Sequence, residues 1–193
     1  FDLMKEAFNT VTILTAGKTG VGKSTLINTV FRESLAETGV GKPVTAHLNY
    51  YKKESVPIAL YDTQGLELSN RTQKSAMKEI IAKVEELYHQ EEQRVDLIWY
   101  CVHTQSKRLE ALEEEFIASL STYAPVVVVM THYYGTDEDE TFKLYLEETL
   151  SNVQEVVPVL AKEVSLTSDI QLKAHSMPYL VSVSEKLLPR HET

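Results

Sequence analysis

Residues 17–24, with the sequence Gly-Lys-Thr-Gly-Val-Gly-Lys-Ser, constrain the fold of this chain more than any other stretch. They match the phosphate-binding loop pattern, in which a glycine, any four residues and Gly-Lys-Ser/Thr connect a strand to a helix. A β-branched run over residues 11–15 predicts the strand, and apolar residues at helical spacing over residues 25–31 predict the helix. Because loop N–H groups point inward and the helix N-terminus adds partial positive charge, the stretch predicts an anion site.

The phosphate-binding loop is expected to hold the phosphates of a nucleotide triphosphate. Gly17 and Gly22 permit backbone angles and close approaches that a Cβ would forbid. Lys23 is expected to reach the β- and γ-phosphates, and the Ser24 hydroxyl is expected to ligate Mg²⁺. The residues expected to contact the phosphates are Gly17, Lys18, Thr19, Gly20, Val21, Gly22, Lys23, Ser24 and Thr25.

Asp62 is also expected at this site, since it closes the apolar strand predicted over residues 56–61. A carboxylate in that place can hold Mg²⁺ through a water molecule. Gly65, three residues later, allows a backbone N–H to approach the γ-phosphate. Thr45, in the loop before residues 47–53, carries a hydroxyl that could complete the Mg²⁺ shell. We therefore predict Mg²⁺ ligands at Ser24, Thr45 and Asp62.

Apolar runs and helical periodicity alternate along the rest of the chain. Strands are predicted over residues 10–16, 47–53, 56–61, 95–102, 126–130 and 156–164. Helices are predicted over residues 1–9, from the loop to about 35, and over 73–92, 111–120, 142–150 and 176–188. Turn formers predict a loop over residues 36–43 and a hairpin connection at 52–55. This order predicts an α/β fold with a mainly parallel sheet, helices on both faces, and the ligand at the carboxyl ends of the strands.

The overall composition limits the domain count and the classes of function. The 193 residues suffice for one domain, expected over residues 1–193, and a chain that begins with Phe1 is expected to be excised from a longer protein. A net charge of −9 argues against binding to DNA. The single cysteine, Cys101, predicts a buried thiol and a reducing, cytoplasmic compartment. The apolar run Ala124–Met130 is too short to span a bilayer, so no transmembrane segment is expected.

The phosphate-binding loop, Thr45 and the run Asp62-Thr63-Gln64-Gly65 resemble the first three motifs of translation-factor-related GTPases, especially the Era-like and septin/Toc/GIMAP-like groups. The resemblance covers nearly the whole chain in element order. It implies a Ras-like P-loop fold with a six-stranded, mostly parallel sheet that has one antiparallel strand, and a site for GTP or GDP with Mg²⁺. It also implies that Thr45 and Gly65 sense the γ-phosphate as switch anchors, which makes Lys23, Thr45 and Gly65 the expected catalytic residues.

The base end of the site departs from the usual family pattern. Guanine is usually read by Asn-Lys-any-Asp after the fifth strand, whereas residues 131–134 are Thr-His-Tyr-Tyr. Thr-His is similar to the Toc-type GTPases, in which the histidine flanks the guanine ring. Thr131 and His132 are therefore expected to contact the base, with Tyr133 or Tyr134 as an aromatic wall. Ser165 stands near the expected fifth motif, where backbone N–H groups meet the guanine O6.

The water-positioning residue is the second departure. Ras-like proteins carry a glutamine directly after the glycine of the third motif, and this chain has Leu66 there. The sequence therefore predicts a switch GTPase with slow hydrolysis, helped by an activating protein or by a homodimer across the nucleotide face. Two alternatives stay open: a nucleotide-dependent interaction module with negligible hydrolysis of its own, and an ATPase on the same loop. The residues expected at the surface without a role are His47, His89, His103, His175 and the acidic run 113–115.

Overall fold

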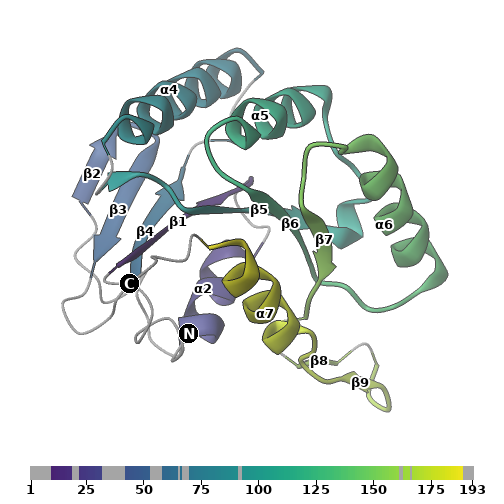
Figure 1. The fold of residues 1–193 in the computed structure, drawn as a ribbon. Coiled ribbons are helices and arrows are strands. Elements are labelled where there is room, and N and C mark those ends of the chain that lie inside the picture. The colour runs from purple at the N-terminus through teal and green to yellow at the C-terminus, as the bar shows by residue number, and fades with distance from the viewer. Residues whose placement is uncertain are drawn as a thin grey trace.

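The computed structural model describes residues 10–18, 22–31, 42–52, 58–64, 66, 70–90, 93–160, 163–165 and 167–188 (Figure 1). The helix predicted over residues 1–9 lies outside these ranges. So do residues 32–35 at the end of the helix predicted after the phosphate-binding loop, and residues 53–55 of the predicted hairpin connection.

A seven-stranded sheet forms the centre of the molecule, in the order β2-β3-β4-β1-β5-β6-β7 (Figure 1). Its strands are β1 (Val11–Ala16), β2 (Lys42–Thr45), β3 (Leu48–Lys52), β4 (Ile58–Thr63), β5 (Leu97–His103), β6 (Val126–Thr131) and β7 (Glu155–Pro158). The neighbours from β4 to β7 pair in parallel, whereas β3 runs antiparallel to β2 and to β4. The mainly parallel α/β sheet predicted from the sequence is confirmed.

The sheet has seven strands rather than the expected six, because β2 adds a strand at one edge. Turn formers predicted a loop up to Pro43, yet Pro43 pairs with Asn49 in the β2–β3 ladder. An edge strand tolerates proline because one side of the strand has no ladder partner, so the missing N–H breaks no hydrogen bond there. The ladder shifts its register between Pro43 and Thr45, which shows that the strand is irregular at this place.

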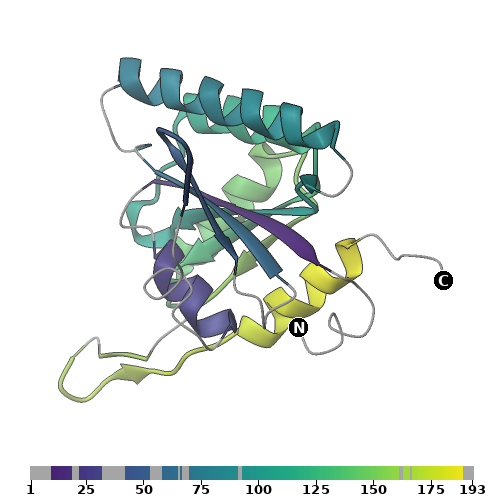
Figure 2. The same cartoon turned by 90° about the vertical axis from the view of Figure 1, so that its left-hand side faces the viewer.

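The last strand of the sheet is shorter than predicted. β7 ends at Pro158, whereas the apolar run predicted a strand over residues 156–164. Proline cannot donate a ladder hydrogen bond, and here it stands at the last paired position of an edge strand. Further along, β8 (Val164–Ser165) pairs antiparallel with β9 (Gln171–Leu172). Both views show this small hairpin extending away from the main sheet (Figures 1 and 2).

The helices form one layer on each face of the sheet (Figure 2). On one face lie α4 (Asn70–Tyr88), α5 (Ala111–Ser121) and α6 (Asp137–Thr149), and on the other lie α2 (Lys23–Phe31) and α7 (Met177–Leu187). The α6 helix begins earlier than its apolar pattern predicted because acidic residues fill its first turn and the Thr136 hydroxyl accepts from the Asp139 N–H at 3.1 Å. Of the described helices, none has both the length and the apolar character needed to cross a membrane.

Alternate residues of each strand pack against the two helical layers. In β5, Ile98 and Val102 pack into the cluster under α4, α5 and α6, while Trp99 and Cys101 pack into the cluster under α2 and α7. Both sets are fully buried, which explains why β5 appears in the sequence as one continuous apolar run. Cys101 is 1% exposed, as the sequence predicted. This two-sided core aligns the parallel strands, so their carboxyl ends meet at one edge.

Candidate nucleotide site

The loop after β1 brings the amine of Lys23 to the end of β4. Nζ of Lys23 donates hydrogen bonds to the carbonyl oxygen of Gly17 at 2.9 Å and to that of Thr63 at 2.8 Å. The same amine lies 3.7 Å from Oδ1 of Asp62. Gly17 and Gly22 have φ angles of 135° and 92°, a region that glycine adopts without strain. Because β1 and β4 are parallel neighbours, Lys23 joins the loops that follow these two strands.

Asp62 is buried beside this lysine with few partners for its charge. Thr15 stands opposite Asp62 in the β1–β4 ladder, and its hydroxyl donates to Oδ1 of Asp62 at 3.0 Å. Burial raises the pKa of the Asp62 carboxyl, and the neighbouring amine of Lys23 opposes that shift. A buried carboxylate in these surroundings is stabilised by a further cation, and carboxylate and hydroxyl oxygens are ligands that Mg²⁺ accepts. The Asp62 environment therefore fits a Mg²⁺ site.

The predicted phosphate contacts in α2 follow Lys23 directly. Ser24 is exposed in the first turn of the helix, where its hydroxyl is accessible to a ligand. The carbonyl oxygen of Thr25 accepts a hydrogen bond from the Thr29 hydroxyl at 2.7 Å, within the same helix. The predicted contacts Thr19, Gly20, Val21 and Gly65 lie outside the described residues.

Thr45 ends β2, in the tight turn that leads into β3. Its hydroxyl accepts a hydrogen bond from the N–H of His47 at 3.3 Å, so it is engaged within its own turn. The carbonyl oxygen of His47 in turn accepts from the N–H of Gln64 at 2.8 Å, which links the Thr45 turn to the loop after Asp62. In the part of the chain that the structure describes, no three His, Cys, Asp or Glu side chains group to hold a metal ion. A Mg²⁺ ion here would therefore depend on hydroxyls, Asp62 and phosphate oxygens.

Lys18 points to the start of α5 rather than lying free beside the loop. Its Nζ is 2.7 Å from Oε1 of Glu110 and 3.7 Å from Oε2 of Glu113. Glu113 accepts from the Tyr100 hydroxyl at 2.9 Å and from the backbone N–H of Glu110 at 2.9 Å. The prediction that residues 113–115 form a solvated face is therefore wrong for Glu113, which is 5% exposed. Its hydrogen bonds from the Glu110 N–H and the Tyr100 hydroxyl, together with its ion pair with Lys18, hold this carboxylate inside the protein.

The strands β5 and β6 end side by side, and two histidines meet there. His103 pairs with Thr131 in the parallel ladder, and the rings of His103 and His132 stack with centroids 4.0 Å apart and planes 2° from parallel. The Thr131 hydroxyl donates to the carbonyl oxygen of Val102 at 3.2 Å, which fixes Thr131 against β5. A Cβ on Gly22 would lie 3.1 Å from Cε1 of His132. The phosphate-binding loop and the predicted base contact are therefore next to each other.

His103 is the residue of this site that the sequence analysis missed. Its signal was its place at the carboxyl end of a buried strand, as for Thr131 and His132 at the end of the next one. The sequence does not show that β5 and β6 are neighbours, and only that adjacency brings the rings together. Burial lowers the pKa of both imidazoles; Lys107 adds to the effect on His103, and His103 adds to the effect on His132. Both rings are thereby favoured in the neutral form.

Asp139 stabilises the loop after β6, and its carboxylate oxygens are engaged by hydrogen bonds and an ion pair. It is fully buried, accepts from the N–H of Tyr134 at 2.8 Å and from Nε2 of Gln105 at 3.2 Å, and pairs with Lys107. Burial opposes the charge, yet these bonds hold the pKa of the Asp139 carboxyl below its usual range. This carboxylate, although near the place of the usual guanine-reading aspartate, serves the structure of the loop.

Tyr133 and Ser165 are two further residues that the sequence predicted at the base end. Tyr133 is 6% exposed and packs into the core under α4, α5 and α6, so it does not form an aromatic wall. Its backbone carbonyl lies 3.0 Å from Nε2 of His175, which is half-buried rather than on the surface. Ser165 is exposed and pairs with Gln171 in the hairpin that extends from the main sheet (Figure 2). The contact between Ser165 and a base stays a prediction.

Leu66 turns into the protein. It is 1% exposed and belongs to the core cluster under α4. An apolar side chain in this position cannot orient an attacking water. Gln64, two residues earlier, is exposed. The position that carries the glutamine in Ras-like proteins therefore supplies no water-positioning group here.

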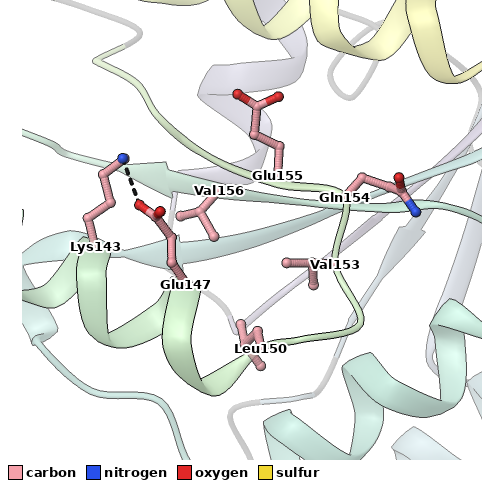
Figure 3. Close-up of a pocket in the computed structure, with 7 residues that line it drawn as sticks. All are labelled: Lys143, Glu147, Leu150, Val153, Gln154, Glu155 and Val156. Atoms are coloured by element: carbon pink, nitrogen blue, oxygen red, sulfur yellow. Dashed lines mark hydrogen bonds and ion pairs between the residues drawn. The ribbon is translucent and has the colours of Figure 1, made fainter.

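A pocket of about 260 Å³ lies away from these motifs, between α6 and β7 (Figure 3). Its lining residues are Lys143, Glu147, Leu150, Val153, Gln154, Glu155 and Val156. Lys143 and Glu147 form an ion pair across one turn of α6 with an N–O distance of 2.7 Å. None of the predicted nucleotide contacts lines this pocket, so we place the candidate site at the strand ends.

The fold and the arrangement around Lys23 define a P-loop GTPase domain. The family described as 50S ribosome-binding GTPase matches residues 12–132, more than half of the chain. The chain belongs to this family. None of the curated proteins compared with the chain matches it in sequence.

Solved structures share the fold at low sequence identity. A probable GTP-binding protein EngB is 16% identical, with a TM-score of 0.62 over 92% of this chain and 98% of that one. Toc33 from Arabidopsis thaliana is 17% identical, with a TM-score of 0.63 over 96% and 87% of the two chains. Era is 20% identical, with a TM-score of 0.63 over 96% of this chain, which spans 59% of the Era chain. The neighbours thus include Era and Toc33, whose fold this chain shares, in agreement with the Era-like and Toc-like resemblance expected from the sequence.

Proposed function

We propose that this domain binds GTP and GDP with Mg²⁺ and acts as a nucleotide-controlled switch that hydrolyses GTP slowly. The position of the Lys23 amine carries the proposal, because it contacts Gly17 in the phosphate-binding loop and Thr63 after Asp62. In such a site, the amine and the loop N–H groups stabilise the charge that develops as water attacks the γ-phosphate. The products are GDP and inorganic phosphate.

The same arrangement supports a Mg²⁺ ion at Ser24 and Asp62. Ser24 follows Lys23 in α2, and the Asp62 carboxylate lies 3.7 Å from the Lys23 amine. When bound, the ion neutralises phosphate charge and orients the β- and γ-phosphates. Related structures support this assignment, since Toc33 was solved in complex with Mg²⁺ and GMPPNP, and Era in complex with MgGDPNP.

The backbone bond between His47 and Gln64 supports the switch role. It joins the Thr45 turn to the loop that contains Gly65, and these are the two segments predicted to sense the γ-phosphate. Thr45 uses one acceptor site of its hydroxyl for the His47 N–H, and a hydroxyl oxygen has a second lone pair that could ligate Mg²⁺. We propose that Thr45 ligates the ion in the GTP-bound form and not in the GDP-bound form.

Binding of labelled GTP, GDP and ATP, with and without Mg²⁺, tests the proposal. We expect GTP and GDP to bind and ATP to compete weakly. Mg²⁺ should strengthen GTP binding, and Asp62→Asn should remove most of that strengthening while Asp169→Asn, on the exposed hairpin, leaves it unchanged. ATP that competes as well as GTP would overturn the guanine assignment and favour an ATPase.

A nucleotide-dependent interaction module is the second candidate. The burial of Leu66 favours it, because the chain lacks a water-positioning group at that place. A homodimer across the nucleotide face or an activating protein would then complete the site. Dimerisation is described as important for the GTPase activity of the chloroplast translocon components atToc33 and psToc159, and a chain of that study shares this fold with a TM-score of 0.64 at 17% identity.

We further propose that residues 1–193 form one GTP-binding domain, with no role in DNA binding. The match of the EngB chain over 98% of its length supports a single domain. The net charge of −9 supports the absence of a DNA partner. A buried, unpaired Cys101 agrees with the reducing, cytoplasmic compartment proposed from the sequence.

A further inference from the structure

We propose that the turn from His103 to Lys107 positions His132 for a purine base, with His103 as the positioning residue that sets base affinity. The inference rests on the proposed nucleotide binding and assigns a role to a histidine outside the family motifs. The turn comprises the end of β5 and the 3-10 helix η2 (Thr104–Ser106). Its residues contact His132 in the loop after β6 and Asp139 in the first turn of α6.

His132 is contacted by Thr131, whose hydroxyl lies 3.2 Å from its Nδ1, and by residues of the turn. Its φ angle is 55°, in the left-handed region that few residues other than glycine adopt without cost. Two contacts from the turn hold it there. The amide Nε2 of Gln105 donates to the carbonyl oxygen of His132 at 2.8 Å, and the His103 ring stacks on the His132 ring at 4.0 Å. Backbone and ring of His132 are thus held from the same turn.

His103 is itself fixed, so it can act as a platform. Its Nδ1 accepts the N–H of Gln105 at 3.1 Å, which orients the ring and places the proton of the neutral imidazole on Nε2. At the far end of the turn, Lys107 pairs with the buried Asp139. Asp139 accepts the N–H of Tyr134, two residues after His132. The turn therefore holds the loop directly at His132 and, through Asp139, at Tyr134.

The stacked rings of His103 and His132 favour a flat aromatic ligand. His103 covers one face of the His132 imidazole, and a base can stack on the other face. Gly22 lies close to His132, since a Cβ added to this glycine would be 3.1 Å from Cε1 of the ring, so a nucleotide whose phosphates lie in the loop has its base end near this ring. Asp139, the buried carboxylate in the first turn of α6, already accepts from the Tyr134 N–H and from Gln105 and pairs with Lys107. Stacking therefore carries more of the base recognition than in a site with a free aspartate.

Competition binding with three variants tests the role of His103. We expect His103→Ala to weaken GTP and GDP binding about three- to tenfold, the size of one aromatic stacking interaction. His103→Phe retains a stacking ring and should stay within about twofold of the wild type. His89→Ala is the matched control, because His89 is an exposed histidine after α4. Inorganic tripolyphosphate, which has no base, should bind all variants equally.

The outcomes separate this inference from the proposed function. If the wild type binds neither GTP nor GDP, the proposed function fails and the inference fails with it. If the wild type binds and His103→Ala binds equally well, the inference alone is overturned. Equal losses for GTP and tripolyphosphate in His103→Ala would also overturn it, because the phosphate end would then be disturbed. A loss with GTP alone that phenylalanine restores is the expected result.

Discussion

At the scale of single residues, burial sets the protonation of the histidines around the loop after β6. Burial lowers the pKa of His103, His132 and His175, with Lys107 adding to the effect on His103 and the ring of His103 adding to that on His132. In the unfolded chain these groups titrate near pH ~6.5, so the unfolded state takes up protons first as the pH falls.

We therefore expect the free energy of unfolding to fall as the pH is lowered from about 7.5 to about 5.5, because the unfolded chain binds more protons in this range. Urea unfolding at several pH values measures the slope. His103→Phe should flatten the slope by removing one titrating group and the repulsion it adds. A free energy of unfolding that rises toward pH 5.5 would contradict the assignment of neutral rings.

The polar residues at the phosphate end differ in how far the sequence alone determines their positions. Lys23 and Ser24 occupy the first turn of a helix directly after the glycine loop, so their places follow from the motif itself. Asp62 reaches Lys23 because β1 and β4 are paired, and Thr15 lies opposite it in the ladder. Thr45 depends on a turn whose geometry the sequence does not determine, and its hydroxyl bonds to the nearby His47 N–H.

At the scale of elements, the start of α5 is tied to the phosphate-binding loop. Glu113 lies on this helix, yet it is buried and accepts from the hydroxyl of Tyr100 in β5. Lys18 reaches across from the loop to Glu110 and Glu113. The loop, a helix and a core strand thereby share one polar network, in which Glu113 and Tyr100 are buried while Lys18 and Glu110 are partly exposed.

We expect Glu113→Ala to lower the free energy of unfolding by about 2 kcal/mol, because it leaves the Tyr100 hydroxyl buried without its acceptor and takes one partner from Lys18. Glu115→Ala, at an exposed position of the same helix, should change it by less than about 0.5 kcal/mol. Urea denaturation of the two variants measures the difference. Equal stability in both would mean that the network is solvated and contributes little.

At the scale of the whole molecule, the described part of the candidate site brings together groups suited to phosphate binding and lacks a water-positioning group after Gly65. The phosphate-binding loop, Lys23 and Asp62 meet at the strand ends, while the position after Gly65 holds an apolar residue that packs under α4. We propose that hydrolysis then depends on a group supplied from elsewhere, either by a second copy across the nucleotide face or by an activating partner.

We expect single-turnover GTP hydrolysis by the isolated domain to be slow, on the order of 10⁻³ s⁻¹, as in GTPases without their activator. If a second copy supplies the missing group, the rate per site should rise with protein concentration. Lys23→Ala is the control, since it should abolish nucleotide-dependent turnover at every concentration. A concentration-independent rate of about 1 s⁻¹ or more would show that one chain holds a complete catalytic site.

The sequence by itself determined the fold class and the phosphate end of the site. Both depend on local order: continuous apolar runs become buried parallel strands, and the glycine loop stands between a strand and a helix that are contiguous in the chain. The seventh strand escaped prediction because its pairing with β3, rather than its own composition, makes residues 42–45 a strand.

Only the tertiary structure shows which residues meet at the proposed base end and which charged residues are buried. His103 and His132 lie far apart in the chain and meet only because β5 and β6 are neighbours. Asp139, Glu113 and Tyr133 look like surface or site residues in the sequence, yet packing buries all three. Burial depends on which elements are adjacent in space, and a linear pattern carries that information only for residues close together in the chain.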